Sequence, residues 1–203
     1  MKFIGITGGV GCGKSMVLRF LESEYHAYII YSDKLAEELC APGGECLSRI
    51  KELIPSVFPK NVIDENGAMD RAAMAETVFN SKEARNVLNG IIHPAVKRRI
   101  IDLISEKRSG GQTELLVLEA ALLVEEGYKE ICDELWYIYA PESERRERLK
   151  EHRGYSDGKI DSVMASQLSE EEFRANCDVV IDNFGSKEDC YEKLRVELDR
   201  LLA

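Results

Sequence analysis

The sequence predicts an α/β fold: a three-layer α/β/α sandwich built on a five-stranded parallel sheet. Two observations predict it. Near-continuous apolar runs of strand length recur along the chain, and segments with helical patterns separate them. Strands of a parallel sheet are covered by helices on both faces, so they are apolar throughout instead of alternating with polar residues.

Five segments have the apolar character of buried strands. The first is followed at once by a glycine-rich loop, the third lies within "ELLVLEAALLV" and is the most apolar, and Pro141 ends the fourth. Helical patterns are expected from Ser15 and, near the end of the chain, from about Ser186 to Leu202. The expected strands cover residues 3–7, 28–31, 115–118, 135–139 and 179–181.

The remaining sequence predicts two insertions in a single domain that covers residues 1–203. The first, about residues 34–114, has helical patterns of its own, including "RAAMAETVF" and a helix that we expect to start at His93-Pro94. Such a helical insertion beside the core is a natural place for substrate specificity. The second, about residues 141–178, is dense in charge, as in "ESERRERLKEHRGYSDGKI".

Composition excludes several classes of protein. The net charge of −10 and the pI near 5.0 argue against general affinity for nucleic acid or anionic membranes. The start, "MKFIGITGG", lacks the apolar region of a secretory signal, and no apolar run reaches the length of a membrane span. The six cysteines show no CxxC spacing. We therefore expect reduced thiols and a cytoplasmic protein.

The glycine-rich loop carries the clearest chemical signal. "GGVGCGKS", residues 8–15, fits the pattern G-x-x-x-x-G-K-[ST] between a strand and a helix, which is the context that a phosphate-binding loop needs. Backbone N–H groups and the helix N-terminus would bind phosphate, Lys14 would reach the β- and γ-phosphates, and the Ser15 hydroxyl would bind Mg²⁺. The alternative is an unrelated glycine-rich turn. The residues expected to bind nucleotide are Gly8, Gly9, Gly11, Cys12, Gly13, Lys14, Ser15 and Met16.

Nucleotide binding does not by itself define a function, because phosphate-binding loops serve several classes of enzyme. The chain has no Asn-Lys-x-Asp motif, which a GTPase would normally have, and it is small for a motor ATPase. The third strand ends in Glu119, which is a candidate for supporting Mg²⁺ through a water molecule or, alternatively, a strand-end cap. The helical insertion and the arginine-rich segment favour a small-molecule kinase.

A carboxylate follows the second strand, in "YIIYSDKL". Asp33 would lie at the carboxyl edge of the sheet, where ligands of such folds bind. A kinase needs a group that accepts or orients the proton of the attacking hydroxyl, and a carboxylate can do both. The alternative is that Ser32 or Asp33 N-caps the helix beginning "KLAEEL"; the two roles are compatible.

The order and spacing of several motifs resemble those of the dephospho-CoA kinase family over nearly the whole chain. Some positions depart from the family pattern: Tyr31 stands where an acidic residue is common, and Ala121, Val124, Phe173 and Cys177 replace its usual Pro, Phe, Lys and Ala. None of these changes affects the loop lysine, the loop serine or Asp33. The motifs, besides Asp33, are "IGITGGVGCGKS", "APGG", "MDRAAMAETVF", "HPAV", "EAALLVEEG" and "QLSEEEFRANCDVVIDNFGS".

This resemblance implies a reaction in which the 3′-hydroxyl of the dephospho-CoA ribose attacks the γ-phosphate of ATP, giving CoA and ADP. ATP and Mg²⁺ are the implied cofactors, and the small molecule dephospho-CoA is the implied partner of a monomer or weak homo-oligomer. Asp33 would take or orient the hydroxyl proton, while Lys14 and Mg²⁺ neutralise charge. The residues expected to contact the acceptor are Thr7, Asp33, Arg71 and His93.

The resemblance also gives the second insertion the role of a lid. Arg148 and Arg153 fall on the family's Arg-Leu…Arg pattern and would close over ATP as catalytic arginines. For Arg145, Arg146 and Lys150 we favour an exposed helix with pairs of opposite charge four residues apart.

Alternatives stay open for the two candidates in the first insertion and for the function. The alternative to acceptor binding is that Arg71 is solvated beside an Asp70 helix cap and that His93 is structural. The alternatives to a dephospho-CoA kinase are a kinase that acts on another nucleoside or nucleotide and a nucleotide-binding regulatory module without phosphate transfer.

Overall fold

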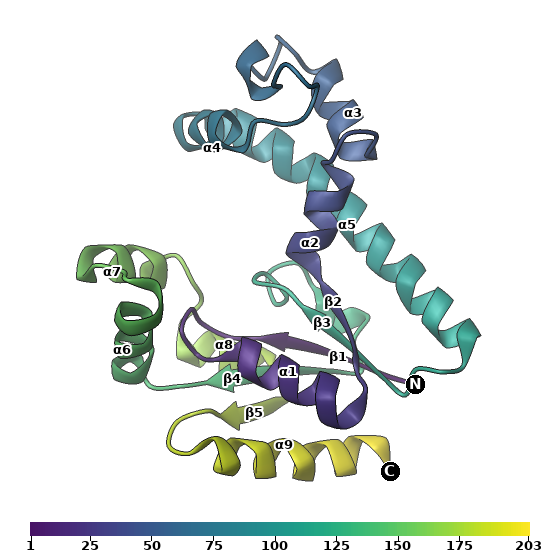
Figure 1. Cartoon of the computed structure of the whole chain (residues 1–203), viewed down its shortest axis with the longest axis vertical. Helices are drawn as coiled ribbons and strands as arrows, with labels where there is room; N and C mark the ends of the chain where they lie inside the picture. Colours follow the sequence, from purple (N-terminus) through teal and green to yellow (C-terminus); the bar gives the residue numbers. More distant parts are fainter. The chain divides into compact units, whose positions relative to one another are not determined.

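The computed structural model describes all residues, 1–203. The chain forms two compact units. Residues 1–30 and 110–203 make up the first, and residues 31–109 make up the second. The elements of each are labelled in Figure 1.

A five-stranded sheet in the order β2-β3-β1-β4-β5 forms the centre of the first unit. The pairings of β1 with β3, β1 with β4, and β4 with β5 are parallel. All of the predicted strands are present, so the predicted α/β fold is confirmed. The strands are β1 (Lys2–Thr7), β2 (Tyr28–Tyr31), β3 (Leu115–Glu119), β4 (Glu134–Tyr139) and β5 (Val179–Asp182).

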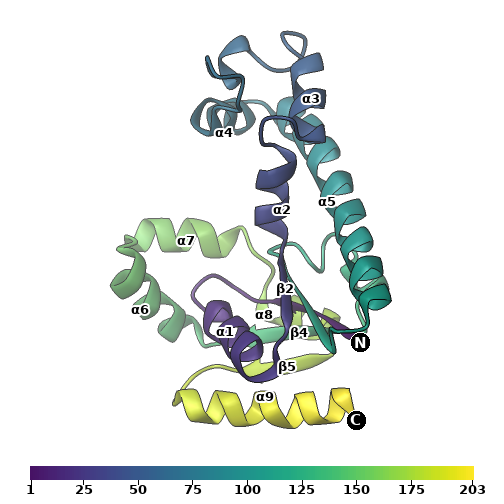
Figure 2. The ribbon, with the colours of Figure 1, turned by 45° about the vertical axis from the view of Figure 1, so that its right-hand side comes forward.

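Helices cover both faces of this sheet. On one face, α1 (Lys14–Tyr25) and α9 (Lys187–Leu202) run side by side, and the rings of Phe20 and Tyr191 stack between them at 4.3 Å (Figures 1 and 2). On the other face, Phe173 of α8 (Glu170–Asn176) stacks on Tyr137 of β4 at 4.7 Å. Since successive side chains of a strand point to opposite faces, Trp136 lies on the α9 side and is fully buried.

Local capping explains where the later helices begin. Ser156 caps α7 (Asp157–Ala165), and Ser169 and Ser186 form capping boxes that start α8 and α9. The last helix therefore begins where the sequence predicts. Before α7, α6 (Glu142–Arg153) ends at Gly154, which adopts a left-handed conformation. The short 3₁₀ turn η2 (Tyr128–Glu130) lies between β3 and β4.

The second unit is helical. It contains α2 (Ser32–Leu39), α3 (Glu45–Glu52), the 3₁₀ turn η1 (Lys60–Val62), α4 (Arg71–Asn80) and α5 (Lys82–Gly110). Figures 1 and 2 show α3 and α4 beside the first half of α5. A small core joins these elements through the buried side chains Ile50, Phe58, Val62, Met74 and Ala84.

The expected helix start at His93-Pro94 is wrong. Pro94 lies inside α5, a single helix of 29 residues. A proline in a helix interior removes one backbone hydrogen bond and costs about 3 kcal/mol. Packing on both sides of Pro94 offsets this cost, because Ala84 belongs to one apolar cluster and Ala95 to another, with Cys40 and Cys46. At Pro94, tertiary packing therefore outweighs the local preference of proline for the start of a helix.

None of the helices combines the length and the apolar character that crossing a membrane requires. All six cysteines are free, and four of them are buried. Burial raises the pKa of Cys46 and Cys132 to about 12, and that of Cys177 and Cys190 to about 11. These four groups are therefore protonated thiols near neutral pH and are poor nucleophiles.

Candidate active site

The glycine-rich loop joins β1 to α1 at the carboxyl edge of the sheet. Gly13, at the N-cap position of α1, has φ 91°, a backbone conformation that residues other than glycine rarely adopt. A Cβ on Gly13 would lie 2.1 Å from Nδ2 of Asn183, so a side chain has no room there. No side chain caps α1. The N–H of Met16 donates to the carbonyl oxygen of Gly13 at 3.0 Å, which leaves the preceding amides, of Lys14 and Ser15, to an anion.

Lys14 and Ser15 follow Gly13 in the first turn of α1. Nζ of Lys14 donates a hydrogen bond of 2.6 Å to the carbonyl oxygen of Gly8, so the ammonium group folds back over the loop. Ser15 is exposed. A charged amine held over a glycine-rich loop at a helix N-terminus can bind a phosphate, as the sequence predicts.

The loop is held from outside by side chains of the segment after β4. Nε of Arg145 donates to the carbonyl oxygen of Val10 at 3.1 Å, and Oε1 of Gln167 accepts from the N–H of Val10 at 2.9 Å. The interpretation of Arg145 as a solvated helix residue is wrong, because this side chain faces the loop. The helical periodicity of the sequence correctly predicts that Arg145 lies on a helix. The part of the protein that its side chain meets depends on how α6 packs.

The other basic residues assigned to an exposed face of α6 form ion pairs, but only Arg146 has a partner four residues away on its own helix. Arg146 pairs with Glu142, four residues earlier, and with Asp161 of α7. Lys150 pairs with Asp157. These are exposed ion pairs of small energetic value.

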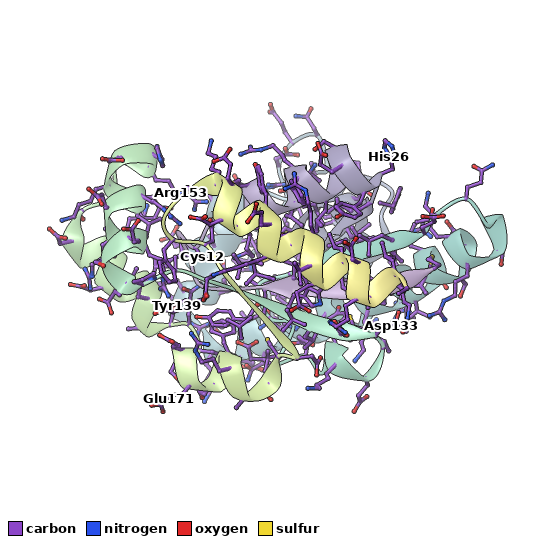
Figure 3. All side chains as sticks on the ribbon, turned by 90° about the horizontal axis from the view of Figure 1, so that it is seen from below. Cys12, His26, Asp133, Tyr139, Arg153 and Glu171 are labelled. Carbon is purple, nitrogen blue, oxygen red and sulfur yellow. The ribbon has the colours of Figure 1, made fainter.

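Asn183 also holds the loop; it lies in the last of the family motifs, but the sequence predicts no individual role for it. It follows β5 directly, and its Nδ2 donates to the carbonyl oxygen of Cys12 at 2.7 Å. Its own N–H donates to the carbonyl oxygen of Tyr139 at 2.7 Å. Figure 3 shows Cys12 and Tyr139 toward one end of the sheet and Asp133 toward the other. A polar residue directly after an apolar strand was the available signal, as it was for Asp33.

The two predicted lid arginines have different surroundings. Nη2 of Arg148 donates to the carbonyl oxygen of Asn183 at 3.0 Å, and Glu144 lies 3.6 Å away. Nη1 of Arg148 is buried without a hydrogen-bond partner, 3.6 Å from where a Cβ on Gly13 would lie. Arg153 is exposed at the end of α6. Arg148 is thus directed at the loop in this structure, whereas Arg153 lies at the exposed C-terminal end of α6.

Asp33 does not cap a helix. Tyr31 is the N-cap residue of α2, without a capping hydrogen bond from its side chain, and Ser32 and Asp33 are the first two residues of the helix. The alternative that Ser32 or Asp33 is the cap is therefore wrong. The Asp33 side chain is exposed. A carboxylate in the first turn is favoured by the helix dipole, and its oxygens are not used in capping.

Thr7 and Glu119 end two neighbouring strands near the loop. Thr7 is buried and is the last residue of β1, while Glu119 ends β3 opposite Ile6. No cluster of three or more His, Cys, Asp or Glu side chains could hold a metal. Hydroxyl and carboxylate oxygens, here of Ser15 and Glu119, suit Mg²⁺, which usually completes its shell with water and substrate phosphates. The residues present therefore fit a nucleotide-bound Mg²⁺.

Arg71 and His93 belong to the second unit. Asp70 N-caps α4 by accepting from the N–H groups of Ala72 and Ala73, as the alternative for this segment predicts. Arg71 is exposed but not simply solvated, since its Nη1 lies 2.9 Å from Oε1 of Glu37. Arg71 and Glu37 line a cavity of about 420 Å³, together with Ala36, Cys40, Ala41, Pro42, Ala68, Met69 and Ile92. His93 lies half-buried within α5.

A phosphate-binding loop of this geometry at the carboxyl edge of a parallel sheet, with an arginine directed at it, is the arrangement of P-loop proteins that act on nucleotide phosphates, a class that includes the P-loop kinases. The family model described as dephospho-CoA kinase matches residues 2–189. The chain therefore belongs to the dephospho-CoA kinase family.

Individual relatives agree with this assignment. A protein of Carboxydothermus hydrogenoformans described as dephospho-CoA kinase is 36% identical over 200 residues, which cover 98% of this chain and 94% of that protein. One from Corynebacterium diphtheriae is 36% identical over 198 residues, covering 98% and 96%. The crystal structure of TT1252 from Thermus thermophilus has a TM-score of 0.78 and 32% identity, covering 98% and 97% of the two chains.

Proposed function

We propose that this chain transfers the γ-phosphoryl group of ATP to the 3′-hydroxyl of the dephospho-CoA ribose and releases CoA and ADP. The observation that carries the proposal is the family match over residues 2–189, with the lysine and serine of the phosphate loop intact. In the transfer, a bond forms between the ribose 3′-oxygen and the γ-phosphorus. The bond between that phosphorus and the oxygen of the β-phosphate breaks, and ADP leaves with those electrons.

The phosphate loop binds the nucleotide in this proposal. Residues Gly8 to Met16 surround the phosphates and bind them through backbone N–H groups, among them that of Gly13, and Lys14 neutralises charge on the β- and γ-phosphates. The Lys14 ammonium now donates to the carbonyl oxygen of Gly8. An anionic phosphate is a better acceptor for it than a carbonyl oxygen. Ser15, with Glu119 acting through water, would hold Mg²⁺, which would supply further neutralisation of the phosphate charge.

Asp33 accepts or orients the proton of the attacking hydroxyl. Its position directly after β2, its exposure and its freedom from capping support this role. Arg148 stabilises the charge on the transferring group, which the buried, unpartnered Nη1 beside the loop supports. Arg153 joins it when the lid closes. Thr7, Arg71 and His93 contact the acceptor.

The same proposal covers the organisation and setting of the protein. Residues 1–203 act as one kinase domain, in which the helical insertion of about residues 34–114 binds the acceptor and residues 141–178 form the lid. The enzyme works in the cytoplasm as a monomer or weak homo-oligomer. The net charge of −10 supports a partner that is a small molecule instead of nucleic acid or a membrane.

A coupled assay of ADP release tests the activity. Protein, ATP and Mg²⁺ are combined with dephospho-CoA, adenosine, AMP or CMP in parallel reactions, and CoA is identified as the product. Turnover that requires dephospho-CoA supports the proposal, provided that Lys14→Ala abolishes it. Turnover with a different acceptor would keep the kinase class and reject the substrate. Nucleotide binding without turnover would instead favour a regulatory module.

A further inference from the structure

Asn183 is one of two polar residues that are buried in this chain, with 6% of its surface exposed. Three of its polar groups have partners in different elements. Its N–H is bound to Tyr139 at the end of β4, its side-chain amide to Cys12 in the loop, and its carbonyl oxygen to Arg148 in α6. The residue thus links the edge of the sheet, the phosphate loop and the helix that carries the arginine.

The backbone bond fixes the position of Asn183. It continues the parallel pairing of β4 with β5, whose last register pair is Tyr139 with Asp182. The side chain therefore projects from a rigid element, and it reaches the loop without a mobile linker. Groups held in this way lose little entropy when they act on a neighbour.

The side-chain amide controls the direction of one peptide of the loop. In a trans peptide the C=O and the following N–H point in opposite directions. Because Nδ2 of Asn183 holds the carbonyl of Cys12 at 2.7 Å, the N–H of Gly13 points away from Asn183. Gly13 is the N-cap residue of α1, so this N–H belongs to the set of amides that would receive a phosphate.

The main-chain carbonyl of the same residue directs Arg148. It accepts from Nη2 at 3.0 Å and leaves Nη1 buried beside Gly13 without a partner. The guanidinium group is planar, so fixing one nitrogen and the side-chain stem fixes the direction of the other.

We propose that Asn183 is a positioning residue, which orients the N–H of Gly13 through the Cys12 carbonyl and orients Arg148 through its own carbonyl. It acts through these groups and does not touch the reacting atoms. This inference rests on the proposed function in one respect, since it takes nucleotide phosphate as the ligand of the loop. It does not depend on which acceptor is phosphorylated.

The test compares three variants of the full chain by calorimetric titration with MgADP and by thermal melting. Asn183→Ala removes the donor, and we expect MgADP affinity to fall about tenfold. Asn183→Asp keeps the volume but puts a carboxylate oxygen against a carbonyl oxygen, so the loss should be larger than for alanine. Asp178→Ala is the matched control, because Asp178 holds the N–H of Leu135 at 2.8 Å at the opposite edge of the sheet.

A pH series separates positioning from a loss of structure. In Asn183→Asp, the introduced carboxyl group would again donate a hydrogen bond to the Cys12 carbonyl once it is protonated. We therefore expect this variant to recover MgADP affinity, relative to the unmodified protein, as the pH is lowered from 8 through the pKa of the introduced group, which burial raises and the neighbouring Arg148 guanidinium lowers. Asn183→Ala should show no recovery. A merely structural role predicts that MgADP affinity follows the melting temperature in all three variants, including Asp178→Ala.

The outcomes decide the inference as follows. Weakened MgADP binding in both Asn183 variants, recovery of the aspartate variant at low pH and unchanged binding in Asp178→Ala support it. Unchanged affinity in Asn183→Ala, or an equal loss in Asp178→Ala, overturns it. Failure of dephospho-CoA turnover in the unmodified protein rejects the proposed function alone, because the titration contains no acceptor.

Discussion

Arg145 and Val10 lie 135 positions apart in the chain, and Nε of Arg145 donates a hydrogen bond to the Val10 carbonyl oxygen at 3.1 Å. Gln167 accepts from the N–H of the same residue at 2.9 Å. Both main-chain polar groups of Val10 are therefore bound by side chains of the segment that follows β4. The shape of the phosphate loop depends on this segment as well as on its own glycines.

Replacing Arg145 should weaken nucleotide binding. One hydrogen bond of this kind contributes about 0.5–1.5 kcal/mol, so Arg145→Ala is expected to lower MgADP affinity by about 2- to 10-fold, measured by calorimetric titration. Arg146→Ala is the matched control on the same helix, since Arg146 binds only to acidic side chains at the surface. Equal affinities for the two variants would show that the Arg145 bond does not shape the loop.

Replacing Asp33 should reduce turnover and leave nucleotide binding intact. A positioned proton acceptor contributes about 10²- to 10⁴-fold to the rate, so kcat of Asp33→Asn with dephospho-CoA should fall by that factor. MgADP affinity should stay within about twofold of the unmodified protein, because Asp33 is assigned no role in nucleotide binding. Glu38→Gln, an exposed change on the same helix, should keep normal turnover. Near-normal kcat for Asp33→Asn would remove Asp33 from the mechanism.

Adding a methyl group to Gly13 should abolish nucleotide binding. The new Cβ would meet Nδ2 of Asn183 at 2.1 Å, and φ is 91°. Gly127 also has positive φ, at 67°, but a Cβ there meets nothing within 4 Å. Gly127→Ala is therefore expected to lower stability by about 1 kcal/mol and to bind MgADP normally. The idea fails if Gly13→Ala binds as Gly127→Ala does.

Removing Glu134 should destabilise the first unit. Its carboxylate accepts from Nε1 of Trp136 at 2.8 Å and from both terminal nitrogens of Arg200 at 2.8 Å. Trp136 is fully buried, so Glu134→Ala leaves a buried donor unpaired, at a cost of about 1–3 kcal/mol. Denaturant titration measures this loss. Glu197→Ala removes only an exposed pair with Arg200 and should change stability little.

The same carboxylate makes stability depend on pH. Hydrogen bonds from Arg200 hold the pKa of Glu134 below its ordinary value. The stabilisation is therefore present above the pKa of the unfolded carboxyl, about 4.3, and is lost as the pH falls through the lower, folded-state pKa. The difference in unfolding free energy between the unmodified protein and Glu134→Gln should shrink as the pH falls below about 4. A constant difference would contradict this assignment.

Much of the fold could be predicted from the sequence because its signals are local. The run Leu115–Leu118 is apolar at every position, which is typical of a strand covered on both faces. The serine at position 186, followed by an acidic residue at 189, marks a helix start that the capping box confirms. The helix start expected at Pro94 failed because packing on both sides of that residue outweighs its local preference.

The sequence by itself determined the loop from Gly8 to Ser15, since glycine spacing, lysine and serine all act within eight consecutive positions. It also placed Asp33 after a strand. Only the tertiary structure decided that Arg145, Gln167 and Asn183 hold that loop, because their partners lie more than 130 residues away. Periodicity shows that residues share a face of a helix, but it does not show what that face meets. That depends on how the chain brings distant segments together at one edge of the sheet.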